Sequence, residues 1–246
     1  MEQFLKHWLG AFVDARRILS LQFLPRYVAE WISFRRQAGG WPVRVADSFP
    51  MLSDRLPTTP FDPHYFHQGN WLARRLAQAK PVQHVDVGSS VLTMGVLSAH
   101  VPTVFVDYRP LVVHQGGLNC VAADITRLPF ADRSIDSLSC LHVIEHIGLG
   151  RYGDPLNADG ALLAARELQR LVSAGGKLYL STPIGRERVC FNAHRVFAPE
   201  TITGWFSELR LIHFSYVADD GGLHEDAAVG DVPVLEYGCG FFEFQR

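Results

Sequence analysis

The chain has 246 residues, a net charge of −2, and 48% hydrophobic and 20% charged residues. This length is enough for one α/β domain with an extension, and the composition excludes wholesale disorder. The near-neutral charge gives no general attraction to nucleic acid, so we expect no nucleic-acid partner. Four cysteines without a CxxC pair, together with the absence of a signal peptide or an apolar run of transmembrane length, favour a cytoplasmic protein.

Residues 1–63 are predicted to form a helical and extended N-terminal extension. Apolar residues recur at helical spacing up to residue 38, with a break expected near Pro25. Residues 41–63 are rich in proline and are expected to cross the main domain in extended form. The arginines of the helical stretch suit an anionic membrane surface, but we favour packing on its own domain or on a second copy as a homodimer.

Residues 64–246 alternate predicted strands with predicted helices, which is the pattern of an α/β, Rossmann-like, doubly wound and mostly parallel sheet. Asp62-Pro63 is typical of a helix cap with a first-turn proline and predicts a helix over 64–78. Strands are expected over 82–87, 103–107, 119–123, 134–143, 177–181 and 211–217, and a final antiparallel strand over 240–244. Further helices are expected from the turn at 88–90 to residue 100, over 155–172 and over 199–208.

Three aspartates, Asp86, Asp107 and Asp124, each close a short β-branched run in HVDVGSS, VFVDYRP and VAADIT. Their spacing corresponds to successive strand–helix–strand steps, so each would lie at the carboxyl end of a parallel strand, where open α/β sheets bind ligands. Such an edge suits an adenosine-containing cofactor, because its ribose hydroxyls and adenine amino group need acceptors. Taken alone, Asp107 is equally consistent with a helix cap or a surface acid.

The turn after the first strand, Gly88-Ser89-Ser90, allows a positive φ and a close approach of ligand to backbone. Ser90 and Thr93 stand where a GxGxxG motif would have further glycines, which disfavours a dinucleotide-dependent dehydrogenase or epimerase. The serines are instead suited to donate hydrogen bonds to an amino-acid carboxylate.

The region from residue 82 to residue 217 resembles the class I S-adenosylmethionine-dependent methyltransferases. The resemblance rests on Asp124-Ile125 followed by LPF and SID, on a hydrophobic strand ending in Glu145-His146, and on LQRLVSAGGKLYLSTP. The segments HIGLGRYGDP and FNAHRV are also similar to an uncharacterised, methyltransferase-like family known as domain of unknown function 268. The resemblance implies a seven-stranded sheet of methyltransferase type and S-adenosylmethionine as the cofactor, and it names no acceptor.

Carried over by position, the resemblance also implies a set of cofactor-binding residues. Asp86, Gly88, Ser89 and Ser90 would hold the methionine end of the cofactor, and Asp107 would hold the ribose. Asp124 and Ile125 would contact the adenine, and Leu141 and His142 would form the inner wall of the site.

Glu145 and His146 are the candidate catalytic residues, because they lie just past the fourth strand. A sulfonium already has a good leaving group, so the protein mainly aligns the acceptor and removes its proton. A histidine with a pKa near ~6.5 is the better base near neutrality, although His146 is also consistent with a cap on the strand end. These candidate bases favour oxygen as the acceptor atom.

Two polar segments at the same sheet edge are candidates for binding the acceptor. GLGRYGD, between the fourth strand and its helix, is either a mobile substrate lid or a glycine-rich structural loop. Asn192, His194 and Arg195, after the fifth strand, would bind a polar or anionic acceptor, Arg195 through its planar guanidinium group. Alternatively, Arg195 could pair with Asp154 of the loop. The candidates are Arg151, Tyr152, Asp154, Asn192, His194 and Arg195.

The sequence therefore predicts a methyltransferase acting on a small-molecule or carbohydrate-like (glycan) acceptor at oxygen. The alternative is a non-catalytic cofactor-binding or scaffold protein of the same fold. No His, Cys and carboxylate residues have the sequence spacing of a zinc site, so no metal is expected.

Overall fold

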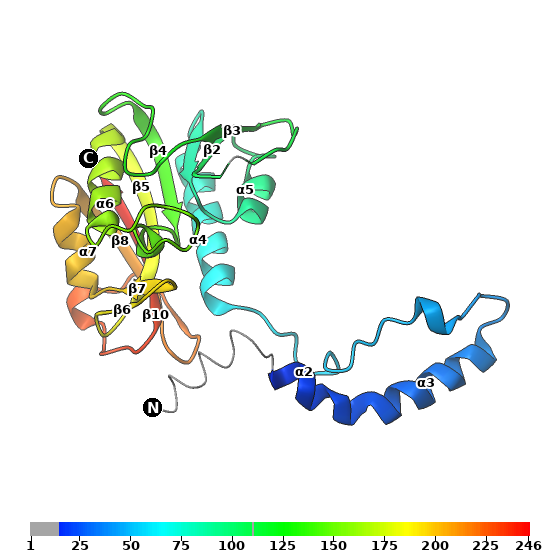
Figure 1. The fold of residues 1–246 in the computed structure, drawn as a ribbon. Helices are drawn as coiled ribbons and strands as arrows, with labels where there is room; N and C mark the ends of the chain where they lie inside the picture. Colours follow the sequence, from blue (N-terminus) through cyan, green and yellow to red (C-terminus); the bar gives the residue numbers. More distant parts are fainter. Residues whose placement is uncertain (1–14, 110) are drawn as a thin grey trace. The chain divides into compact units, whose positions relative to one another are not determined.

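The computed structural model describes residues 15–109 and 111–246. The chain divides into two compact units, Met1–Phe61 and Asp62–Arg246 (Figure 1). Within the described residues, none of the helices combines the length and apolar character needed to span a membrane.

The first unit contains α2 (Ala15–Ser20), the 3-10 turn η1 (Leu21–Phe23) and α3 (Leu24–Gln37), followed by a mostly extended segment that includes η2 (Val45–Asp47). The predicted break near Pro25 is confirmed, since η1 interrupts the helix and the proline lies in the first turn of α3. A proline is tolerated there because the first turn has no intrahelical partner for its missing N–H. The helix predicted before residue 15 lies outside the described residues.

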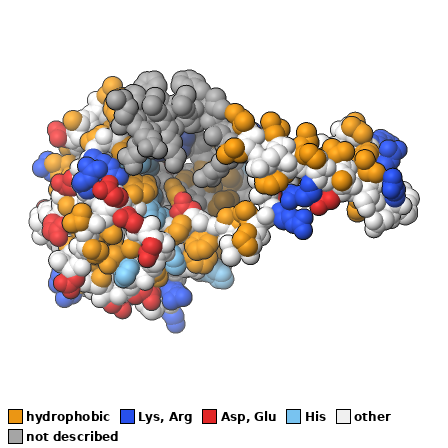
Figure 2. All heavy atoms as spheres, turned by 90° about the horizontal axis from the view of Figure 1, so that it is seen from below, with side chains coloured by type: hydrophobic (Ala, Val, Ile, Leu, Met, Phe, Trp, Pro, Cys, Tyr) orange, Lys and Arg blue, Asp and Glu red, His pale blue; other side chains and the backbone are white. Residues whose placement is uncertain are grey.

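The extended segment of the first unit folds back along α3. A guanidinium nitrogen of Arg26 lies 3.4 Å from the carbonyl oxygen of Leu52, and Arg55 lies 3.5 Å from the carboxylate of Glu30. In the structure this segment contacts the helix of its own unit, and its crossing of the main domain stays a prediction. No residue of α3 is buried. Figure 2 shows hydrophobic side chains exposed along this unit; they include Ile18, Leu19, Leu21, Val28, Phe34, Trp41, Phe49 and Phe61.

The second unit is built on one sheet with the strand order β3-β2-β1-β4-β5-β10-β8-β9 (Figure 1). The strands are β1 (His84–Val87), β2 (Thr103–Asp107), β3 (Leu118–Ala122), β4 (Ile135–Leu141), β5 (Val172–Ile184), β8 (Arg210–Val217), β9 (Leu223–His224) and β10 (Gly238–Gln245). The first five are parallel, and β10 runs antiparallel to both β5 and β8. The predicted fold class is confirmed, with β9 as a two-residue addition at the edge.

Helices cover both faces of this sheet. α4 (Pro63–Ala79) and α5 (Val91–Leu97) pack on one face, with Trp71, Leu72 and Met94 in its core, while α6 (Gly160–Leu171) and α7 (Pro199–Trp205) pack on the other. Asp62 caps α4 as predicted, because its carboxylate accepts hydrogen bonds from the first amides of the helix at 2.9 and 3.2 Å. The two apolar layers hold the carboxyl ends of β1 to β4 at one edge.

Several predicted boundaries were wrong, two of them for clear local reasons; β5, for example, also begins at Val172 rather than at residue 177. α6 begins at Gly160 rather than at residue 155, because residues 155–159 turn beneath the preceding loop and the amide of Asn157 donates to the carbonyl of Gly148 at 3.0 Å. β5 continues through Pro183 to Ile184. The last pairing of β5 with β4 joins Ser181 to Leu141, so the missing N–H of Pro183 interrupts no ladder on that side.

Candidate functional site

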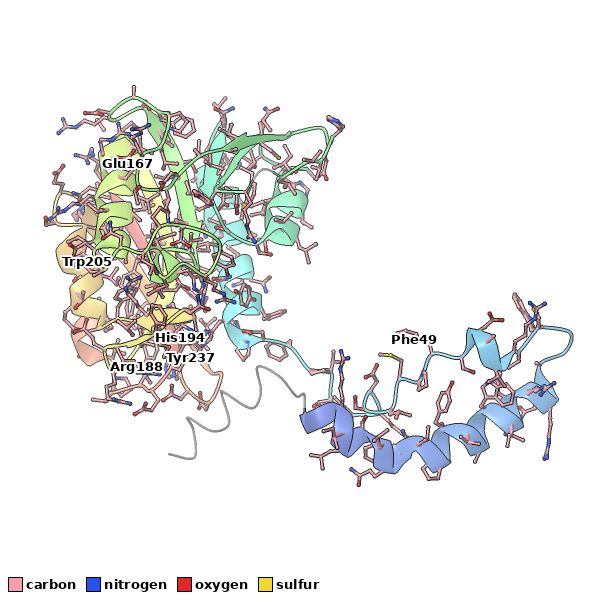
Figure 3. The ribbon with its side chains drawn as sticks, in the orientation of Figure 1. Phe49, Glu167, Arg188, His194, Trp205 and Tyr237 are labelled. Carbon is pink, nitrogen blue, oxygen red and sulfur yellow. The ribbon has the colours of Figure 1, made fainter. Side chains whose placement is uncertain are left out.

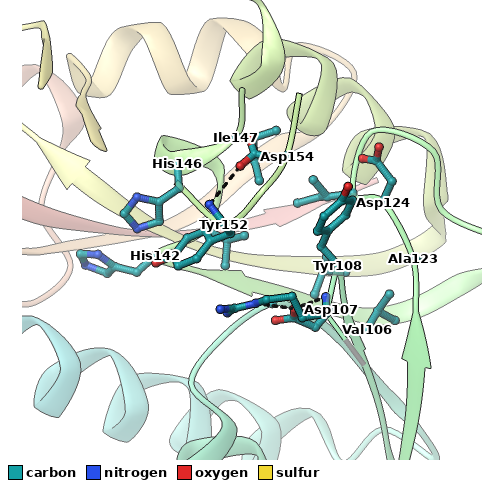
Figure 4. Close-up of a pocket in the computed structure, with 15 residues that line it drawn as sticks. Val106, Asp107, Tyr108, Ala123, Asp124, His142, His146, Ile147, Tyr152 and Asp154 are labelled. Atoms are coloured by element: carbon teal, nitrogen blue, oxygen red, sulfur yellow. Dashed lines mark hydrogen bonds and ion pairs between the residues drawn. The ribbon is translucent and has the colours of Figure 1, made fainter. Parts of the chain in front are cut away.

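A pocket opens at the carboxyl ends of β1 to β4. It encloses about 700 Å³ including its open mouth. Its walls come from the ends of the four strands and from the loop after β4 (Figure 4). The lining residues that the sequence predicted are Gly88, Asp107, Asp124, Ile125, His142, His146, Tyr152 and Asp154.

Asp107 and Asp124 line this pocket at the ends of neighbouring strands (Figure 4). One oxygen of Asp107 accepts from the amide of Arg109 at 2.7 Å, and one oxygen of Asp124 accepts from the amide and hydroxyl of Thr126 at 2.8 and 2.7 Å. In the described part of the chain, the second oxygen of each carboxylate accepts no hydrogen bond. The site therefore offers two oriented acceptors about one strand apart, with the apolar Ile125 beside them.

Gly88 forms the floor of the pocket at the end of β1. Its φ is +71°, and a Cβ added there would lie 3.0 Å from Cγ1 of Val143. Both the left-handed conformation and the close approach to the loop after β4 require glycine at this position. A ligand in the pocket thus meets bare backbone here.

Asp86 is withdrawn from the pocket, although the sequence placed it at the cofactor. Its side chain is completely buried, and its carboxylate accepts bonds from the amide of Ser89 at 3.1 Å, from the Ser89 hydroxyl at 2.6 Å and from the Ser139 hydroxyl. Burial raises the pKa of Asp86 to about 6, against the effect of these bonds. Asp86 and Ser89 therefore shape the turn that carries Gly88. Ser90 precedes α5 without a side-chain capping bond.

Glu145 lies between two histidines beneath the pocket. It belongs to the 3-10 turn η3 (Ile144–His146), has no exposed surface, and approaches Nδ1 of His142 at 3.0 Å and Nε2 of His146 at 3.7 Å. Because Glu145 does not line the pocket, it cannot itself reach an acceptor from this position. Its carboxylate instead acts on the two imidazoles.

The orientation of His146 follows from one short contact. Its Nδ1 lies 2.6 Å from the carbonyl oxygen of Ala193, so Nδ1 carries a hydrogen and donates it. In the neutral ring the lone pair is then on Nε2, the atom that faces Glu145. Burial lowers the pKa of His146, which favours this neutral form. His146 thus has one basic nitrogen, Nε2, and the Glu145 carboxylate lies 3.7 Å from that atom.

The loop GLGRYGD closes one side of the pocket through Tyr152. The ring of Tyr152 is flanked by two guanidinium groups, those of Arg109 at 4.6 Å and Arg151 at 5.1 Å, and lies edge-on to His146 at 5.6 Å. Asp154 accepts from the amide of Gly148 at 2.7 Å, so its carboxylate holds the loop in shape. The loop is therefore ordered by its own aspartate and tied across the pocket by Tyr152.

Arg195 does not face the pocket, contrary to its predicted role in acceptor binding. It is buried on β7 (His194–Val196), and its guanidinium donates to the carbonyl oxygens of Ile147 at 2.7 Å and of Ala158 at 3.2 Å, with longer bonds to those of Glu145 and Asn157. It therefore fixes η3 and the turn before α6. It also does not form the predicted alternative pair with Asp154.

The other predicted residues lie near the pocket without lining it. Asn192 connects β6 (Arg188–Cys190) to β7, His194 packs 5.0 Å from the ring of Tyr237 (Figure 3), and Leu141 is buried in the core. Sequence reasoning missed seven lining residues. Two of them, Tyr108 and Arg109, directly follow the predicted Asp107, and that adjacency could have indicated them. The missed residues are Val87, Val106, Tyr108, Arg109, Ala123, Val143 and Ile147.

Residues 126–218 match the family model described as "Caenorhabditis protein of unknown function, DUF268". Solved structures are similar to a larger part of the chain than this segment. The chain is 14% identical to the N-methyltransferase NodS of Bradyrhizobium japonicum WM9 in complex with S-adenosyl-l-homocysteine, with a TM-score of 0.51 over 82% of this chain and 93% of that one. The chain is thus similar to the DUF268 model over residues 126–218, and its fold is like that of these solved structures.

Two further solved structures support this fold. YcgJ of Bacillus subtilis is 14% identical, with a TM-score of 0.52 over 74% of this chain and 98% of that one. The [4+2]-cyclase SpnF is 13% identical, with a TM-score of 0.51 over 73% and 80%. No curated protein matches the sequence. A cyclase and an N-methyltransferase thus share the fold, so the reaction has to be argued from the site itself.

Proposed function

We propose that this chain is an S-adenosylmethionine-dependent methyltransferase that acts on a small-molecule or carbohydrate-like acceptor at oxygen. The observation that carries the proposal is the pair of free carboxylate oxygens of Asp107 and Asp124 at the ends of β2 and β3, on the wall of one pocket. The neighbouring NodS structure, which holds S-adenosyl-l-homocysteine, supports the same class of cofactor.

The pocket has the groups that this cofactor requires. Asp107 is suited to accept from the ribose hydroxyls, and Asp124 from the adenine amino group, with Ile125 packing on the adenine ring. Gly88 lets the methionine portion approach the backbone. Since Asp86 and Ser89 are bonded to each other, they contribute by fixing this turn rather than by contacting the cofactor.

His146 is the residue that we propose as the base. Its Nε2 would accept the proton of an acceptor hydroxyl as the oxygen attacks the methyl group and the sulfonium leaves as a thioether. The buried carboxylate of Glu145, 3.7 Å from Nε2, would stabilise the resulting imidazolium. Glu145 is therefore a positioning residue, and His146 is the catalytic one.

Calorimetric titration with S-adenosylmethionine tests the cofactor assignment. We expect Asp107→Asn and Asp124→Asn each to weaken binding about 10- to 100-fold, because each removes a charged hydrogen-bond acceptor. Asp159→Asn is the matched control, since this exposed carboxylate lies outside the pocket and makes no capping bond. Absence of binding by the wild-type chain at millimolar cofactor would rule out the proposal.

A mass-spectrometric screen of metabolites and glycans, incubated with the protein and S-adenosylmethionine, tests the reaction. A product heavier than its acceptor by one CH₂ group shows methyl transfer. His146→Ala should then lower turnover while leaving cofactor binding intact. Cofactor binding without any methylated product would favour the alternative, a non-catalytic protein of this fold.

A further inference from the structure

Three potential metal ligands meet beside the pocket, from parts of the sequence that are far apart. They are His64 in the first turn of α4, His142 directly after β4, and Cys239 at the start of β10. Their ligand atoms all lie within 4.8 Å of one another. The proposed methyl transfer uses neither His64 nor Cys239. Their separation along the chain explains why sequence spacing predicted no metal.

His142 is held with one ring nitrogen available to a metal. Its Nδ1 lies 3.0 Å from Oε1 of Glu145, and its Nε2 lies 3.0 Å from Sγ of Cys239. A hydrogen on Nδ1, directed at the carboxylate, leaves the lone pair on Nε2 facing the sulfur. A carboxylate behind a ligating histidine is the usual arrangement that fixes its tautomer at metal sites. The positive φ of His142, +56°, holds the residue in this turn.

Glu145 is an independent sign that a cation belongs here. Its carboxylate is completely buried, and neither oxygen meets the geometry of a hydrogen bond. Within residues 15–109 and 111–246, its only ion-pair contacts are to His142 and His146, with no Lys or Arg among them. A buried carboxylate with no Lys or Arg beside it is costly, and a divalent ion bound by His142 would compensate its charge.

His64, in the first turn of α4, supplies the third side chain of the cluster. The Asp62 cap fixes the first turn of α4 by bonding the backbone amide of His64 at 2.9 Å. Its ring lies 5.5 Å from that of His142 and 5.3 Å from that of Tyr237. The described part of the chain offers no hydrogen-bond partner to either ring nitrogen. His64 therefore brings an unused nitrogen to the buried His142 and Cys239.

We propose that His64, His142 and Cys239 bind a zinc ion. Two imidazole nitrogens and one thiolate suit zinc better than magnesium or calcium, which prefer oxygen ligands. Three protein ligands leave a fourth tetrahedral position for water or another ligand, as in catalytic rather than structural zinc sites. The competing explanation is a metal-free bond in which the Cys239 thiol donates to His142.

Metal analysis of the purified, untagged full chain tests the proposal first. We expect stoichiometric zinc by elemental mass spectrometry, and replacement by cobalt(II) should give a thiolate-to-metal charge-transfer band together with the d–d bands of tetrahedral coordination. Neither readout depends on S-adenosylmethionine, so failure of the proposed methyltransferase activity would leave this test intact.

Matched variants assign the ligands. Cys239→Ser should lose the charge-transfer band, whereas Cys140→Ser, an equally buried thiol on β4 outside the cluster, should keep it. His64→Ala, at a partly exposed position, provides a second test if Cys239→Ser fails to fold, and it should lose the tetrahedral d–d bands. Glu145→Gln should weaken zinc binding about 10- to 100-fold in a chelator competition. Folded wild-type protein that takes up neither metal would overturn the proposal and support the thiol–imidazole bond. A charge-transfer band that persists in Cys239→Ser would overturn the assignment of Cys239 as a ligand.

Discussion

His84 and Asp86, two residues apart on β1, bond the same hydroxyl group, that of Ser139. The Ser139 hydroxyl donates to Asp86, so Nε2 of His84 donates to Ser139 at 2.8 Å and Nδ1 accepts from Ser137 at 2.8 Å. The network continues through Asp86 to Ser89, whose hydroxyl oxygen accepts from the amide of Leu141 at 2.9 Å. β1 and β4 are thereby locked together beneath the turn that carries Gly88.

These two buried groups should give opposite pH dependences of stability. Burial lowers the pKa of His84 from 6.5 to about 4, so its contribution is full above pH 6.5 and is lost as the pH falls toward 4. The pKa of Asp86 is raised from 3.8 to about 6, so its contribution is greatest below pH 3.8 and is lost as the pH rises toward 6. At 1.36 kcal/mol per pKa unit, each effect is of order 3 kcal/mol.

Urea unfolding between pH 7 and 4 checks this pair. Asp86→Asn should make the loss of stability on acidification steeper than in the wild type, because it removes the opposing contribution. His84→Gln should make the loss shallower. His100→Gln changes an exposed histidine and should follow the wild-type profile. Changes of the same sign in both buried variants would contradict the assignment.

Gly88→Ala should weaken both the fold and cofactor binding. The added methyl group would meet Val143 at 3.0 Å, and the φ of +71° is unfavourable for alanine, so we expect a loss of roughly 1–3 kcal/mol. Gly95→Ala is the control. Its methyl group would meet no atom within 4 Å on α5 and should stabilise the helix by about 0.5–1 kcal/mol. Urea midpoints and calorimetric titration measure the two effects.

Arg195→Lys should destabilise the chain although it keeps the charge. An ammonium cannot reproduce the planar fork that bonds the carbonyls of Ile147 and Ala158, and each buried carbonyl left without a donor costs about 1–3 kcal/mol. Arg188→Lys, which removes a single bond to the carbonyl of Arg186 at a more exposed position, should have little effect. Limited proteolysis within residues 148–158 should accelerate only in the Arg195 variant.

Tyr152→Ala should raise the dissociation constant for the cofactor several-fold, whereas Tyr152→Phe should retain near wild-type affinity. The difference follows because the contacts of the ring to Arg109 and Arg151 use its face and not its hydroxyl group. Equal weakening in both variants would show that the hydroxyl group, rather than the ring, matters for binding.

The sequence predicted where the strands of the site end better than it predicted what each side chain does there. Strand ends can be read from β-branched runs, so Asp107, Asp124 and Gly88 were placed at one edge, where the structure has them. The same pattern cannot show which way a carboxylate turns. Asp86 bonds inward because Ser139, more than fifty residues later, supplies a hydroxyl group inside the sheet.

Arg195 and Cys239 illustrate a second limit. Their surroundings depend on the placement of β7 beside η3 and of β10 beside β5, which no local pattern encodes. Arginine after a strand is as consistent with ligand binding as with bonding to backbone carbonyls. Only the positions of the carbonyls of η3 and the turn before α6 decide between the two.

The stack of Arg109 on Tyr152 has a kinetic consequence. Arg109 is two residues from Asp107 and bonds its carboxylate through its amide, while its guanidinium lies 4.6 Å from the ring of Tyr152 on the loop after β4. A molecule that binds the Asp107 carboxylate therefore also affects Arg109, whose guanidinium contacts Tyr152 of the loop after β4. Occupation of the pocket and movement of the loop should then relax with one shared rate constant in a stopped-flow trace, and a second molecule would enter only after that step.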